Sequence, residues 1–151
     1  MPQTIALGAD HAGYALKNHL KAWLENQGCV CIDVGTDSTE RCDAIDFAVP
    51  ACKAVLANQA DMALLVCGTG AAMSMAANKL DGIRACCCSD SFTAELTRRH
   101  NNANVLCLGA RVLGEGLAEK LVELFLHTPF EGGVYQARND KLTALEQSRN
   151  A

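Results

Sequence analysis

Two periodicities of apolar positions alternate along this chain and mark its predicted elements. Short, almost continuously apolar runs are typical of strands buried inside a sheet, whereas the spacing of Leu16, Leu20 and Leu24 is typical of a helix face. Strands are predicted at 4–9, 30–34, 62–67, 83–88 and 105–108. Helices are predicted from Leu16 to near Gly28 and at 47–58, 69–79, 91–100, 113–127 and 140–148.

The alternation of strands and helices favours an α/β fold with a doubly wound, mainly parallel sheet. Ligands of such folds bind at the carboxyl ends of the strands, where the strand order switches. Several reactive or small residues are expected at these ends: Asp10, His11, Cys67, Thr69, Ser89, Asp90, Gly109 and Arg111. With no repeat or linker in the sequence, residues 1–151 are predicted to form a single domain. The polar last helix fits a solvated tail or, as we favour, a dimer arm.

Composition narrows the class of protein. Of 151 residues, 50% are hydrophobic and 20% charged, and the net charge of -4 gives no support to nucleic-acid or anionic-membrane partners. No apolar run is long enough for a spanning helix, and the start of the chain does not read as a secretory signal. The nine cysteines include no C-x-x-C pair, which favours reduced thiols in a cytoplasmic protein over disulfides or zinc. Five of them are predicted to fill the core: Cys29, Cys31, Cys86, Cys87 and Cys88.

One cysteine ends the third predicted strand, in the segment Cys67-Gly68-Thr69-Gly70-Ala71-Ala72. Glycines let a ligand approach the backbone, and the N–H groups of a following helix attract anions and stabilise a thiolate. The segment indicates chemistry on an anionic or enolisable small molecule. Cys67 could act as a general base or as a covalent nucleophile, or could be one more packed cysteine. The glycine spacing matches neither a dinucleotide fingerprint nor a Walker loop, so nicotinamide binding is disfavoured.

Other candidate side chains lie after the first strand and in the last third of the chain. Asp10 fits a helix cap, and His11 beside it fits a donor to a sugar or phosphate oxygen. His100, followed by Asn101, fits a proton shuttle with an amide beside it. Arg111 and Arg138 fit phosphate clamps, because guanidinium groups bind phosphate oxygens in pairs, although each also fits a surface charge.

Together these motifs resemble the ribose-5-phosphate isomerase B and galactose-6-phosphate isomerase family, over nearly the whole chain. The specific segments are Gly8-Ala9-Asp10-His11-Ala12-Gly13, Cys67-Gly68-Thr69-Gly70, Ala76-Ala77-Asn78-Lys79, Gly82-Ile83-Arg84-Ala85, His100-Asn101-Asn102-Ala103-Asn104-Val105, Gly109-Ala110-Arg111 and Phe130-Glu131-Gly132-Gly133. The resemblance implies a Rossmann-like three-layer α/β/α sandwich with a five-stranded parallel sheet and a C-terminal dimer-arm helix. It also implies a homodimer or a tetramer of dimers, without metal or cofactor.

The resemblance further implies that an aldose phosphate, by default ribose 5-phosphate, is converted to its ketose through a cis-enediolate. On this implication Cys67 moves the proton between the two carbons, and Thr69 and the N–H groups of residues 68–72 stabilise the oxyanion. His100, helped by Asp10, opens the sugar ring. The implied substrate contacts are Gly68, Gly70, Ala71, Ala72, His11, Asn101, Arg111 and Arg138, in a pocket shared between two subunits.

Three positions depart from the family's usual pattern. Asp43 is followed by Ala44-Ile45 in place of tyrosine and proline, Ala71-Ala72 replaces a pair that ends in glycine, and Val134-Tyr135 replaces arginine and histidine. The implied catalytic residues are retained while substrate-contacting positions differ, so another four- to six-carbon sugar or sugar phosphate stays a rival substrate. A non-catalytic sugar-phosphate-binding protein and a cysteine hydrolase are the two alternatives from other classes.

Overall fold

A five-stranded parallel sheet forms the centre of the computed structural model, which describes residues 2–151. Its strands are β1 (Thr4–Ala9), β2 (Val30–Asp33), β3 (Met62–Cys67), β4 (Ala85–Cys87) and β5 (Val105–Gly109). They lie in the order β2-β1-β3-β5-β4, and each neighbouring pair is parallel. Because the chain continues outward to β2 on one side and to β5 and β4 on the other, the strand order switches between β1 and β3.

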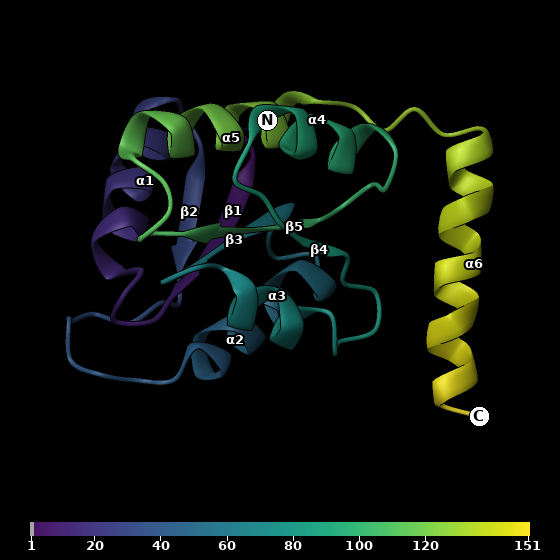
Figure 1. Ribbon diagram of the computed structural model, residues 1–151, viewed down its shortest axis with the longest axis horizontal. Helices are drawn as coiled ribbons and strands as arrows, with labels where there is room; N and C mark the ends of the chain where they lie inside the picture. Colours follow the sequence, from purple (N-terminus) through teal and green to yellow (C-terminus); the bar gives the residue numbers. More distant parts are fainter. Residues whose placement is uncertain (1) are drawn as a thin grey trace.

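Helices cover both faces of this sheet (Figure 1). One face packs against α1 (Tyr14–Asn26), α4 (Ser91–Arg99) and α5 (Glu115–His127), with a core that includes Leu20, Leu64 and Phe125. The other face packs against α2 (Ala44–Leu56) and α3 (Ala71–Ala77), with a core that includes Cys52 and Leu65. Alternate residues of each strand enter opposite cores, as the pleat requires, so the predicted three-layer α/β/α sandwich is confirmed.

The last helix, α6 (Val134–Arg149), stands apart from these layers, on the side of the sheet where β4 lies (Figure 1). Asn139 is its one buried residue among those described. Near its end, Glu146 accepts a hydrogen bond from the Gly82 N–H at 3.2 Å, and Arg149 pairs with Asp81 at 3.1 Å. A cavity of about 370 Å³ lies between the middle of α6 and the segment around β4, and Leu142 and Leu145 line it on the side of the helix.

The predicted strands and helices are all present, but some boundaries were wrong. The last helix begins at Val134 and not at residue 140, directly after Gly132 and Gly133, whose φ angles of 69° and 58° lie in the left-handed region that favours glycine. The prediction missed this start because α6 has no continuous apolar stripe. Cys88 fills the core as predicted, whereas Cys87 is exposed, because β4 ends at the edge of the sheet.

Candidate active site

Cys67 ends β3 at the switch point, with its side chain 4% exposed. Its Sγ accepts a hydrogen bond from the backbone N–H of Gly70 at 3.1 Å. Gly70 has φ 84°, and a Cβ built there would lie 2.7 Å from the Cys87 Sγ, so this turn requires glycine. The turn therefore aims a backbone donor at the thiol, as the Cys67 segment predicted.

The residues after Cys67 present backbone and small side chains to the surface. Thr69 is exposed, and its Oγ1 accepts a hydrogen bond from the Ala71 N–H at 3.3 Å. Ala71 and Ala72, also exposed, open α3. Arg111 lies over this loop: its N–H donates to the Gly68 carbonyl at 3.0 Å, and a Cβ at Gly68 would lie 3.7 Å from the Arg111 Cδ. A cation thus stands beside the thiol-bearing loop.

Asp10 and His11 follow β1 at the same edge. The Asp10 N–H donates to the Val66 carbonyl at 3.3 Å, which places this turn next to the residue that precedes Cys67. Asp10 is 8% exposed, and its Oδ1 accepts the Gly13 N–H at 3.0 Å, which closes the turn before α1. The predicted helix cap was wrong, because the N-cap of α1 is Gly13, without a side-chain cap hydrogen bond. The His11 Nδ1 lies 3.2 Å from both the N and the O of Cys42, in the loop before α2, which fixes the ring.

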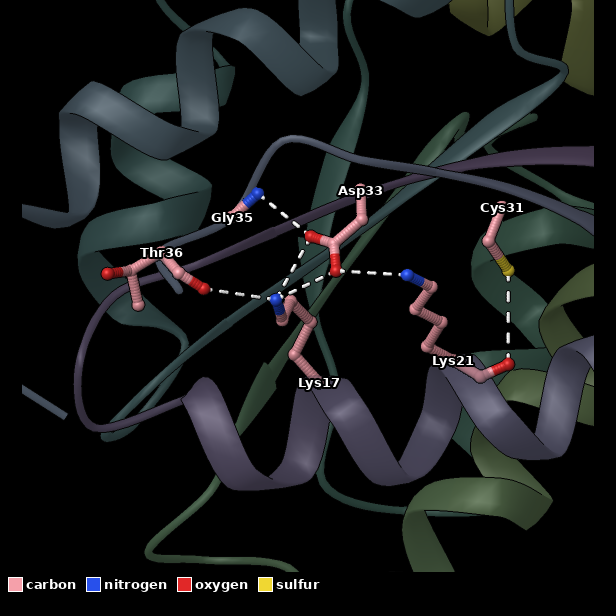
Figure 2. Close-up of polar contacts among 6 residues, drawn as sticks. All are labelled: Lys17, Lys21, Cys31, Asp33, Gly35 and Thr36. Carbon is pink, nitrogen blue, oxygen red and sulfur yellow. Dashed lines mark hydrogen bonds and ion pairs between the residues drawn. The ribbon is translucent and has the colours of Figure 1, made fainter. Parts of the chain in front are cut away.

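A buried ion pair between α1 and the end of β2 lies next to this edge of the sheet (Figure 2). The Lys17 Nζ, on a side chain 3% exposed, lies 2.9 Å from Asp33 Oδ2 at the end of β2 and donates to the Thr36 carbonyl at 3.1 Å. The Thr36 N–H in turn donates to the Ala9 carbonyl at 2.9 Å, directly before Asp10. Sequence patterns missed Lys17, because its helical position reads as one more surface lysine; its place on the inward face beside Leu16 and Leu20 was the available signal.

His100 lies at the opposite edge of the sheet. It directly follows α4. Shortly after it, just before β5, the carbonyl of Asn104 accepts a hydrogen bond from the Ala63 N–H at the start of β3, so this segment lies at the edge where the strands begin. Its imidazole stacks on the ring of Tyr135 in α6, and its carbonyl accepts a hydrogen bond from the Asn139 side chain at 3.3 Å. Arg138 lies beside Tyr135, with its guanidinium carbon 5.5 Å from the ring centroid.

The candidate residues thus form two groups in one chain. Cys67, Thr69, Asp10, His11 and Arg111 lie at the carboxyl edge of the sheet, and His100, Asn101 and Arg138 lie at the amino edge and on α6. Since β5 spans five residues at a rise of about 3.3 Å per residue, the two edges stand about 15 Å apart. One chain alone does not bring the predicted proton-transfer residues Cys67 and His100 together.

Most other thiols are held in their neutral form by burial. Desolvation raises the pKa of Cys88 to about 12 and those of Cys31 and Cys52 to about 11, and it raises the pKa of Cys107 well above its ordinary value. Although Cys87 is an exposed residue, partial desolvation of its sulfur raises its pKa, and the neighbouring Cys67 raises it further. These cysteines lack the backbone donor that faces Cys67, which distinguishes the candidate base from its neighbours.

Residues 2–151 contain neither a cluster of metal ligands nor a membrane-spanning helix. No group of three or more His, Cys, Asp or Glu side chains in this range is arranged to hold a metal ion. No helix in this same range has both the length and the apolar character needed to cross a bilayer.

Comparison with known proteins places the chain in a family. The Ribose/Galactose Isomerase family model matches residues 5–142. Ribose-5-phosphate isomerase B of Escherichia coli is 45% identical over 97% of this chain and 98% of its own length, and D-erythrulose-4-phosphate isomerase of Pectobacterium atrosepticum is 38% identical over 95% of each. The structure of ribose-5-phosphate isomerase B from Mycoplasma genitalium with bound ribulose-5-phosphate superposes with a TM-score of 0.91 at 37% identity, covering 95% of this chain and 96% of that one. The chain therefore belongs to the ribose/galactose isomerase family and is an isomerase.

Proposed function

We propose that this isomerase interconverts an aldose phosphate and its ketose, with ribose 5-phosphate and ribulose 5-phosphate as the default pair. The observation that carries the proposal is the Gly70 N–H hydrogen bond to the Cys67 Sγ, at the sheet edge shared with Asp10 and His11. The Cys67 thiolate takes the proton from C2, which leaves a cis-enediolate with its charge on O1. Return of that proton to C1, while the O2 proton passes to O1, gives the ketose.

The other groups of the carboxyl edge have roles that follow from their charge and place. Thr69 and the N–H groups of residues 68–72 stabilise the enediolate oxyanion, because donors fixed before the reaction need no reorganisation. His11, held by Cys42, and Arg111, beside Gly68, bind the phosphate. Asp10 assists ring opening from this edge.

A second copy of the chain supplies the remaining groups in this proposal. We place His100, Asn101 and Arg138 in the site of a partner, as ring opener, hydroxyl contact and phosphate clamp, and the separation of the two edges supports this placement. Two large apolar side chains support such a contact, because Phe92 at the start of α4 is 71% exposed and Met75 on α3 is 69% exposed. The enzyme is accordingly a homodimer, or a tetramer of dimers, whose single-domain subunits extend over residues 1–151.

A shorter or differently shaped sugar phosphate is the second candidate substrate. Ala44 opens α2 where the resemblance implies a tyrosine, and the exposed Val134 stands where it implies an arginine. Losing one charge-assisted phosphate contact costs about 1.5–3 kcal/mol of binding. The relative from Pectobacterium that is named for a four-carbon substrate fits this alternative. A cytoplasmic location agrees with the nine free cysteines.

Incubation with aldose phosphates of four to six carbons in deuterated water tests reaction and substrate together. We expect ketose formation with solvent deuterium at the carbon next to the carbonyl, because the proton on a thiol exchanges with solvent. Comparison of kcat/KM across the panel identifies the substrate. Failure to isomerise any sugar phosphate would refute the proposed substrate class and would point to a sugar without phosphate.

A further inference from the structure

The phenol ring of Tyr135 lies flat against the imidazole of His100. Their ring centroids are 4.0 Å apart, and the ring planes differ by 7°. Both side chains are half-buried, one from α6 and the other from the end of α4. Contact across a full ring face restricts rotation about the Cβ–Cγ bond of the histidine, because any large turn would lose the overlap. Tyr135 therefore determines the plane in which the His100 nitrogens point.

The same helix also holds the backbone of His100. Asn139 follows Tyr135 by four positions, so both project from one face of α6. The buried Asn139 side chain donates to the His100 carbonyl at 3.3 Å. Because α6 contacts both the ring and the carbonyl of His100, its first turns hold His100 in position.

Charged groups complete the surroundings of the ring. Glu131, just before α6, has its Oε2 4.0 Å from the His100 Nε2, and its other oxygen accepts a hydrogen bond from the Arg99 Nε at 2.7 Å. The Glu131 carboxylate thus stands near one ring nitrogen, while the stack fixes the plane of the ring. Proton transfer requires heavy atoms about 2.6–3.2 Å apart, so a tilted imidazole would lose the transfer even with its backbone in place.

We propose that Tyr135 is a positioning residue for ring opening, which it serves by holding the His100 imidazole flat; the inference rests on the proposed role of His100. Tyr135 acts through His100 and takes no proton itself, so its hydroxyl is dispensable and its ring face is not. Its loss therefore harms only substrates that must be opened before they enolise. A four-carbon aldose 4-phosphate cannot close a furanose ring and gives the matching comparison.

The test compares Tyr135→Leu with Tyr135→Phe, and uses Gln136→Ala, an exposed neighbour on α6, as the control. We expect Tyr135→Leu to lower kcat on ribose 5-phosphate by roughly tenfold or more, the scale of a misplaced catalytic group, and to leave kcat on erythrose 4-phosphate within about twofold. Tyr135→Phe and Gln136→Ala should stay within about twofold on both substrates. Equal losses on both substrates, or no loss with Tyr135→Leu, would overturn the inference.

A second measurement removes the dependence on the four-carbon substrate. In a Cys67→Ser background, which blocks enolisation, ring opening still exchanges the two anomers of ribose 5-phosphate, and NMR saturation transfer measures that rate. Tyr135→Leu should slow the enzyme-dependent exchange by roughly tenfold, and Tyr135→Phe should restore it. An unchanged exchange rate refutes the role of Tyr135. Wild-type enzyme that accelerates neither anomer exchange nor isomerisation of ribose 5-phosphate refutes the proposed function itself.

Discussion

The carboxyl edge of the sheet and the surroundings of His100 are built in different ways. At the carboxyl edge, Cys67 and Asp10 are buried and held by backbone groups of their own strand ends, and Lys17 ties that edge to α1. His100 is half-buried and is held by Tyr135 and Asn139 from a helix that stands outside the sandwich. One edge is complete within a single sandwich, whereas the other depends on how α6 is seated.

This difference matches what each region does in the proposed reaction. Enolisation needs a base and an oxyanion site with little freedom, because the charge that develops must meet fixed donors. Ring opening uses a group that we place in the site of another copy, so the chain has to present it outward. A peripheral helix that carries Arg138, and that holds His100 through Tyr135 and Asn139, is suited to that second task.

Removal of the base should have the largest effect on turnover. We expect Cys67→Ser to lower kcat by roughly a hundredfold or more while substrate still binds, which is the scale of general base catalysis. Cys88→Ala is the matched control: this thiol is buried and its pKa is raised to about 12, so its loss should reduce stability and leave kcat unchanged. Near-normal turnover by Cys67→Ser in coupled assays would refute the base.

Mixing two impaired variants, assayed on ribose 5-phosphate, tests the separation of the two edges. If each site combines the carboxyl edge of one copy with His100 of another, a heterodimer of Cys67→Ser and His100→Asn contains one intact site. Random reassortment after partial denaturation should then restore about a quarter of wild-type activity, since half of the dimers are mixed and each has one working site. No recovery, with mixed dimers verified by mass spectrometry, would place both groups in the same chain's site.

A comparison of ribose 5-phosphate with a four-carbon substrate should distinguish the roles of the two edges, with a smaller effect on kcat. We expect His100→Asn to lower kcat on ribose 5-phosphate by roughly tenfold or more, and to spare a four-carbon aldose phosphate that has no ring to open. Cys67→Ser should impair both substrates, because both must be enolised. Equal losses in His100→Asn would indicate that this residue binds substrate.

Sequence patterns predicted the carboxyl edge better than the surroundings of His100, for a physical reason. Cys67, Thr69 and Gly70 lie within one short segment, so a strand end followed by glycines already specifies their geometry. The Tyr135–His100 stack joins segments far apart in the chain, and the spacing of apolar residues in those segments does not predict it. The place of His100 at the amino edge could have been inferred from topology, because a helix that connects two parallel strands ends where the next strand begins.

Asn78 and Asn104 show a second kind of information that motif reading passes over. The Asn78 side chain donates to the Ala85 carbonyl and accepts the Ala85 N–H, both at 2.9 Å, so it pairs with β4 much as another strand would. The Asn104 side chain accepts the Arg84 N–H at 2.8 Å. Both residues belong to motifs of the family resemblance, and their side chains support the short edge strand and the residue before it.

The buried ion pair should have the smallest effect on turnover and a clear effect on stability. Lys17→Met leaves Asp33 without the cation 2.9 Å away, and breaking a buried pair costs about 3–5 kcal/mol of unfolding free energy; about 3 kcal/mol is expected here because Asp33 is partly solvated. Lys21→Met is the control within the same network: Lys21 lies 3.7 Å from the same carboxylate and is more exposed, so its loss should cost under about 1 kcal/mol (Figure 2). Urea unfolding measures both values.

In folded Lys17→Met, kcat should fall by only a few-fold, since Lys17 reaches Asp10 through Thr36 and Ala9 and touches no reacting group. Equal stability of the two variants would show that Lys17 does not anchor this edge, and a loss of kcat as large as that of Cys67→Ser would place it within the chemistry.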